Sequence, residues 1–250
     1  MGFFDGLFDK EKKEQKKYQK LEKTLTNMYV QPSERSLVIQ TLVELETEEA
    51  IRILLTRYRE SAPNSTVDLE EKQYVYDVLV TMGRQPKVDV IGTIVKYLQS
   101  VDGHINWPLK VLTDCVDLKE FTEILVTLLK GCTTDYVQDP QKKQELILRA
   151  SEFKSPDVAQ ELLRFLEDMN ETVRFHTIES LIAQEATEEI QEALREQFIE
   201  EESLRIVQKL SAAFENHHEW KFPEAQHEAI QLVLPDEYGL HKNGHVYLRR

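Results

Sequence analysis

Apolar side chains recur every three or four residues along most of the chain, which is the period of an amphipathic α-helix. Five segments show this best, each with an apolar anchor followed by apolar or aromatic residues four and eight positions later. The anchors are Ala50, Val90, Phe121, Val158 and Ile190, the second positions Leu54, Ile94, Leu125, Leu162 and Leu194, and the third positions Tyr58, Leu98, Leu129, Leu166 and Phe198. Because the anchors follow at nearly regular intervals, the segments predict an internal repeat. We expect the second positions to be buried between helices of neighbouring repeats.

Between these segments the same period predicts further helices, so each repeat is a helical hairpin. They cover residues 33–45, 70–82, 108–116, 141–153, 171–184, 201–214 and 223–234. Thr47 and Thr187 mark helix starts, because each is a capping hydroxyl followed by two glutamates at the positive end of the helix dipole. Gly83 and Gly131 mark helix stops of the left-handed kind. The pattern predicts an all-α chain of about twelve or thirteen helices in one continuous stack.

The N-terminal residues 1–28 depart from the repeat. They contain seven lysines against five acids, and Phe3, Phe4, Leu7 and Phe8 lie on one side of the predicted basic helix. An apolar tip of this kind needs a cover. We expect the chain's own first repeat to cover it; a partner protein and an anionic membrane surface are the alternatives.

The C-terminal residues 234–250 depart from the repeat as well. Asn243-Gly244 is a turn pair flanked by β-branched and aromatic residues, which predicts a small hairpin that caps the last helix. The predicted organisation is therefore a basic helix at 1–28, an α-solenoid at 29–233 and a cap at 234–250.

One stretch, LLRFLEDMNETVRFHTIESLIAQ at 162–184, resembles a HEAT repeat of the short bacterial kind. In that family a leucine-rich helix ends near an aspartate and valine-arginine opens the next helix, and Asp168, Val173 and Arg174 match this pattern. The resemblance is best over residues 155–215; the other repeats lack the aspartate and arginine. It implies an α-α superhelix, or solenoid, of HEAT-like hairpins. It also implies that Arg174 satisfies a carboxylate and carbonyl oxygens at the turns, which form a structural ladder.

Composition and charge limit the fold class and the kinds of partner that the chain can bind. The chain has only 8 glycines and 8 prolines, few for a β-rich fold, and a formal net charge of -14. Such an acidic chain repels nucleic acid and suits a basic protein or peptide partner. The apolar stretch at the N-terminus is too short for a secretory signal, and no apolar run in the chain reaches the length of a membrane span. We expect a cytoplasmic protein.

Candidate chemistry is sparse. Cys115 and Cys132 follow no zinc spacing, and the many glutamates between Glu179 and Glu202 are typical of a solvated helix surface. Most of the histidines lie near the C-terminus, at His217, His218, His227, His241 and His245, without a metal-binding helical motif. The sequence predicts no catalytic residue, no metal site and no cofactor.

The expected function is a non-enzymatic scaffold or adaptor that binds a protein or peptide on the solenoid surface. Two alternatives stay open. HEAT-like stacks include enzymes such as bilin lyases and alkylpurine DNA glycosylases. The first alternative is therefore an enzyme or enzyme subunit of the lyase type. A glycosylase would require a basic face that this acidic chain lacks. Peripheral membrane attachment through residues 1–28 is the other. The sequence does not indicate an oligomeric state.

Overall fold

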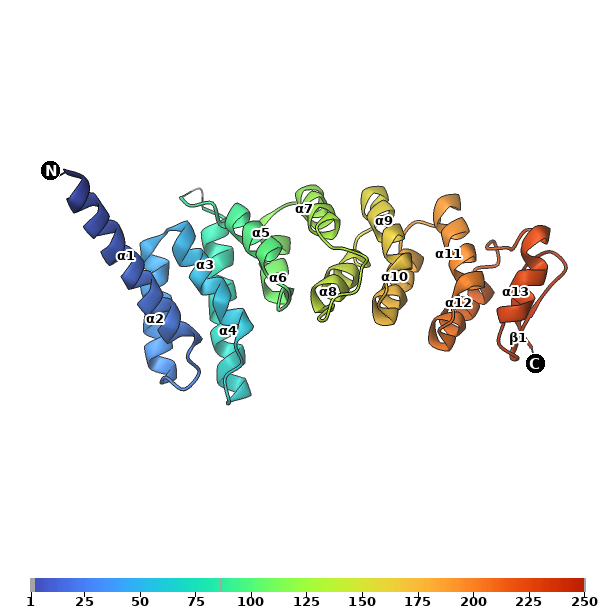
Figure 1. Ribbon diagram of the computed structural model, residues 1–250, viewed down its shortest axis with the longest axis horizontal. Coiled ribbons are helices and arrows are strands. Elements are labelled where there is room, and N and C mark those ends of the chain that lie inside the picture. Colours follow the sequence, from blue (N-terminus) through green and yellow to red (C-terminus); the bar gives the residue numbers. More distant parts are fainter. Residues whose placement is uncertain (1–2, 86, 250) are drawn as a thin grey trace. The chain divides into compact units, whose positions relative to one another are not determined.

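The computed structural model describes the backbone of residues 3–85 and 87–249 and the side chains of residues 12–85 and 87–249 (Figure 1). Within these residues the chain forms thirteen α-helices, three short 3-10 helices and one two-stranded sheet. The predicted all-α class is therefore confirmed. None of the helices described is both long enough and apolar enough to cross a bilayer.

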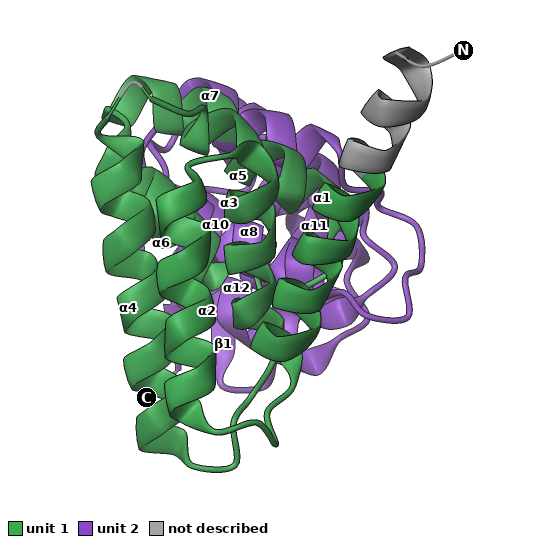
Figure 2. Ribbon diagram, turned by 90° about the vertical axis from the view of Figure 1, so that its left-hand side faces the viewer, with its two compact units in different colours: residues 1–124 green, residues 125–250 purple. Residues whose placement is uncertain are grey.

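The chain divides into two compact units, residues 1–124 and 125–250 (Figure 2). The first contains α1 (Phe3–Thr26), α2 (Pro32–Leu45), α3 (Glu48–Thr56), η1 (Arg57–Arg59), α4 (Ser65–Gly83), α5 (Val90–Ser100) and α6 (Asn106–Cys115), and α7 (Leu118–Lys130) crosses the boundary. Helices α1, α3 and α5 pack side by side in one layer, and α2, α4 and α6 pack in a second. The domain boundaries predicted after residues 28 and 233 stay predictions.

The second unit contains α8 (Gln141–Ala150), α9 (Pro156–Leu163), η2 (Arg164–Glu167), α10 (Glu171–Ala183), α11 (Glu188–Glu200), α12 (Leu204–Asn216), η3 (Glu224–Gln226) and α13 (His227–Val233). Helices α9, α11 and α13 form one layer, and α8, α10 and α12 form the other. Strands β1 (Tyr238–Leu240) and β2 (Val246–Leu248) pair antiparallel. The C-terminal hairpin expected from the sequence is thus present, and its strand β2 packs against α12.

The hydrophobic period identifies the core correctly. Leu54, Ile94, Leu125, Leu162 and Leu194 have no exposed surface, and the other ten repeat positions are also buried. Each is apolar because every third or fourth residue of these helices faces a neighbouring helix. The prediction that the second positions are buried is confirmed.

The helix ends follow the predicted caps but not the predicted glycine geometry. The hydroxyls of Thr47 and Thr187 accept hydrogen bonds from backbone N–H groups three residues later, at 3.2 and 3.3 Å. Helices do end at Gly83 and before Gly131, yet neither glycine takes a left-handed conformation. A Cβ on Gly83 would lie 2.7 Å from the Cys115 sulfur, so close packing of α4 on α6 explains that glycine instead.

Candidate functional site

Two neighbouring hollows lie on the layer of α1, α3 and α5 in the first unit. Their volumes are about 370 and 390 Å³, and they share Glu22, Thr56 and Arg59. We call them together the α1–α3–α5 groove. The residues lining it are Gln19, Glu22, Lys23 and Thr26 of α1, Glu48, Glu49, Arg52 and Thr56 of α3, Arg59 and Glu60 at and after η1, Thr93, Lys96, Tyr97 and Ser100 of α5, and Val101.

The groove exists because α1 is fixed beside α3. Among residues 12–26 of α1, Tyr18 and Leu25 are the buried side chains, and α1 packs on α2 and α3. The hydroxyls of Tyr18 and Thr47 lie 2.8 Å apart in a hydrogen bond. Thr47 is also the N-cap of α3, so one side chain both begins that helix and holds α1 against it.

Arg52 bridges the two walls of the groove. Its guanidinium donates to both oxygens of Glu22 on α1, at 3.2 and 3.1 Å, and to both oxygens of Glu49 on α3, at 3.0 and 2.9 Å. Hydrogen bonding to Glu49 and then to Glu22 raises the pKa of Arg52 against the opposing effect of burial. Because the Arg52 side chain is 42% exposed, these pairs position the walls more than they stabilise the fold.

Three other cations remain accessible in the groove. Arg59 and Lys23 are exposed and make no ion pair within the described residues. Lys96 lies 3.4 Å from Glu48 at the rim, where both side chains are more than half exposed. These groups are therefore free to meet the acidic groups of a ligand.

The hydroxyls of the groove are already occupied. Thr26, Thr56, Thr93, Tyr97 and Ser100 each donate to a backbone carbonyl oxygen, at distances from 2.6 to 3.2 Å. Burial raises the pKa of Tyr97 to about 12, so this phenol stays protonated at neutral pH. The described lining holds neither histidine nor cysteine. The arrangement offers charged groups for binding and no nucleophile paired with a base.

Arg174 satisfies acceptors at two turns. It lies in the first turn of α10, where its Nε and Nη2 donate to the Glu201 carboxylate at 3.0 and 2.8 Å and its Nη1 donates to the Asp168 carbonyl oxygen at 2.9 Å. Burial raises the pKa of Glu201, but Arg174 and the Ser203 N–H outweigh it and the pKa is lowered. Val173 is fully buried beside it. The guanidinium thus joins the turn before α10 to the turn before α12.

The Asp168 carboxylate has a different partner, Lys143 of α8. The Lys143 ammonium lies 2.5 Å from Asp168 and also donates to the carbonyl oxygens of Thr133 and Asp135, at 3.0 and 3.3 Å. Lys143 therefore occupies in α8 the place that Arg174 has in α10. Lys143 could not be identified from the arginine pattern because lysine replaces arginine here, although both helices carry a cation in the first turn.

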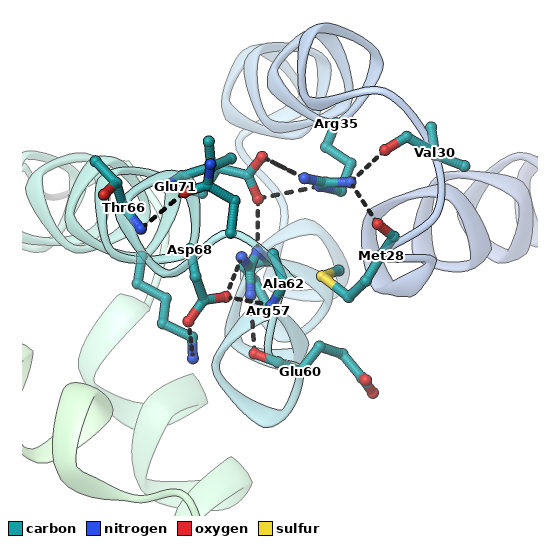
Figure 3. A network of polar contacts seen from close by, with 12 residues as sticks. Met28, Val30, Arg35, Arg57, Glu60, Ala62, Thr66, Asp68 and Glu71 are labelled. Carbon is teal, nitrogen blue, oxygen red and sulfur yellow. Dashed lines mark hydrogen bonds and ion pairs between the residues drawn. The ribbon is translucent and has the colours of Figure 1, made fainter.

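Arg35 of α2 repeats the arrangement in the first unit (Figure 3). It donates to the carbonyl oxygens of Val30 and Met28, at 2.5 and 3.4 Å, and to the Glu71 carboxylate of α4 at 2.8 Å. Glu71 also accepts from Arg57 at 2.9 Å, and all three charged side chains are buried. This repeat does lack the aspartate, since Glu71 supplies the carboxylate from inside α4, but it has an arginine in Arg35, contrary to expectation.

Asp68 completes the buried network. It accepts from Arg57 at 2.7 Å and from the Ala62 N–H at 2.8 Å, and Lys72 lies 2.8 Å from its second oxygen. Burial would raise its pKa, but Lys72, Ala62 and Arg57 together hold the pKa of Asp68 at about 2. Every charge in the network has an opposite partner, so its chemistry is structural.

The remaining candidates contribute less. The side chains of Phe3, Phe4, Leu7 and Phe8 lie outside the described residues. Among the described residues, no group of three or more histidine, cysteine, aspartate or glutamate side chains has the geometry of a metal site. Near the C-terminus, His218 and His245 lie 3.1 Å apart, Nδ1 to Nε2, and the rings of His241 and His245 stack with centroids 6.0 Å apart. Cys115 and Cys132 are free, and burial raises the pKa of both thiols.

Comparison with known proteins gives no relative. No family model, no curated protein and no solved structure matches the chain. The resemblance to HEAT repeats rests on the residues of the chain alone.

Proposed function

We propose that the protein is a non-enzymatic cytosolic scaffold that binds a polypeptide partner in the α1–α3–α5 groove. The observation that carries the proposal is the combination of occupied hydroxyls and accessible charges in one groove. A surface that binds by charge and shape requires fixed walls, and Arg52 supplies them by joining Glu22 to Glu49.

The HEAT-like solenoid is part of this proposal. Three observations support it: the two-layer order of helices inside each unit, the burial of all repeat positions, and the first-turn cations Arg35, Lys143 and Arg174, each of which bonds turn carbonyls and a carboxylate of the following hairpin. The curvature of a solenoid creates an extended concave surface that can bind a partner. The groove lies on one such layer, formed by α1, α3 and α5.

The charges indicate what kind of segment fits. Arg59 lines both hollows and has no acidic partner in the described part of the chain, so it suits a carboxylate of the bound segment. The net charge of -14 favours a partner that is basic elsewhere on its surface, because opposite potentials speed association. The proposed ligand is thus a polypeptide that places an acidic side chain at Arg59.

The test compares two arginine variants in capture from the native cell. Arg59→Glu places a like charge in the groove, whereas Arg84→Glu makes the same change of charge on an exposed arginine at the end of α4. We expect a photo-crosslinker at position 100 to capture the same protein with the parent and with Arg84→Glu, but not with Arg59→Glu. Equal capture by all three, or equal loss in both variants, would contradict the proposal.

A further inference from the structure

The lysines of α1 lie on a single face. Residues of an α-helix are separated by about 100°, and this rotation gathers Lys12, Lys13, Lys16, Lys17, Lys20 and Lys23 within less than half of the circumference. We call these six residues the lysine face. Tyr18, Leu25, Glu14 and Glu22 fall on the opposite side, so no acid of this stretch interrupts the lysine face.

Most of this face points away from the first unit, and only Lys23 at its edge also lines the groove. Tyr18 and Leu25 on the opposite side are buried against α2 and α3, whereas all six lysines are exposed. Residues 12–17 are all exposed, and six successive residues pass around the whole helix. This stretch of α1 therefore stands clear of the other described helices on every side.

No other described side chain neutralises the charge of the lysine face. None of the six lysines makes an ion pair in the part of the chain that the structure describes, while Glu22 pairs with Arg52 instead. Along the helix, Lys12 and Lys23 are separated by roughly 16 Å. A chain of net charge -14 thus carries one continuous basic stripe.

We infer that the lysine face docks α1 on an anionic membrane surface. All six cations are lysines, which act as point charges toward a diffuse negative surface, whereas specific phosphate recognition favours the planar fork of arginine. A row of lysines beside an anionic bilayer contributes about 1 kcal/mol per residue, and the attraction falls off within a Debye length of the surface.

Other polyanions match these features less well. A nucleic acid bound along α1 would bring its phosphates close to the acidic residues of the rest of the chain, which repel them. At residues 12–17 the lysine face stands clear of the other helices of the first unit. An anionic surface can therefore approach these lysines with less repulsion from the acidic residues of that unit.

Co-sedimentation of the full chain with vesicles tests the inference. The parent should bind phosphatidylcholine/phosphatidylserine vesicles, should not bind pure phosphatidylcholine vesicles, and should be released by salt because screening weakens the attraction. The variant Lys13→Gln/Lys16→Gln/Lys20→Gln should lower the partition coefficient roughly 100-fold, since each lysine contributes about 1 kcal/mol at such a surface. Glutamine keeps the helix propensity of lysine.

A matched variant controls for net charge. Lys154→Gln/Lys221→Gln/Lys242→Gln removes three exposed lysines elsewhere that make no ion pair among the described residues, and it should bind like the parent. Thermal melts should be the same for all three proteins.

Four results would overturn the inference. They are equal binding to neutral and anionic vesicles, no binding to either, equal losses in the two triple variants, and binding to poly-glutamate or DNA without binding to vesicles. The outcome is independent of the groove, because no residue changed in the lysine-face variant lines it. Loss of partner capture with intact vesicle binding would therefore contradict the proposed scaffold function alone.

Discussion

The two units satisfy the cations at their helix turns in different ways. In the first unit, one carboxylate, Glu71, serves two buried arginines, Arg35 and Arg57. In the second unit, Lys143 and Arg174 have separate carboxylates, on Asp168 and Glu201 respectively. A shared carboxylate makes the first unit depend on one side chain, whereas separate pairs divide that dependence.

The largest effect should follow removal of the shared carboxylate. Glu71→Ala leaves Arg35 buried without a carboxylate, whereas Arg57 keeps Asp68, and a buried charge left unpaired costs about 3–5 kcal/mol. Glu70→Ala changes an exposed neighbour on the same helix and should be nearly neutral. Urea unfolding measures both, and similar midpoints for the two variants would contradict the network's role.

Replacing a buried leucine by alanine gives a loss of stability that can be compared between the two units. Leu54 in the first and Leu194 in the second have no exposed surface, so replacing either by alanine should cost roughly 2–5 kcal/mol. Leu37→Ala, at a side chain that is 64% exposed, should cost much less. Urea unfolding checks the ranking, and a small loss at Leu54 or Leu194 would indicate that the burial is wrong there.

The separate pairs should show smaller, local effects. Arg174→Ala removes the donor to Glu201 and should cost about 1–3 kcal/mol. A double-mutant cycle should find strong coupling between Arg174 and Glu201, because they share two hydrogen bonds. Coupling between Arg174 and Asp168 should be weaker, since Arg174 contacts only the backbone oxygen of Asp168. Equal coupling in both cycles would contradict the separate-pair description.

The smallest effect is the acid dependence of the first unit. The pKa of Asp68 is lowered to about 2 in the folded chain, below its value of about 4 when unfolded. Its contribution to stability is therefore complete above pH 4 and is lost as the pH falls toward 2. Asp68→Asn should flatten the stability profile in this window, and Asp102→Asn, at an exposed position, should not. Urea midpoints at several pH values measure the difference.

The sequence predicted the helices well because the buried positions of a helix recur every three or four residues and are occupied by apolar side chains. It also predicted the C-terminal hairpin, since Asn243-Gly244 suits a tight turn and Gly244 takes a left-handed φ of 83°. The sequence did not predict the features that tertiary packing determines. Gly83 is explained by the approach of Cys115, and left-handed conformations occur at Glu46 and His104, which no local pattern distinguishes.

The groove was not predicted, for a related reason. Its charged lining comes from Glu22, Arg52 and Lys96, which lie on three helices far apart in the sequence. Periodicity indicates which face of each helix is buried, but not which exposed side chains of different helices meet. The partner of Arg174 was missed in the same way, because Glu201 belongs to the next hairpin.

One contact links the lysine face to the groove. Tyr18 of α1 bonds the hydroxyl of Thr47, and Glu22, one turn further along α1, forms part of the groove wall. Because α1 is one continuous helix, its exposed stretch at 12–17 and its groove residue Glu22 belong to the same element. The basic stripe and the groove wall are therefore built from a single run of residues, which Tyr18 fastens to the start of α3.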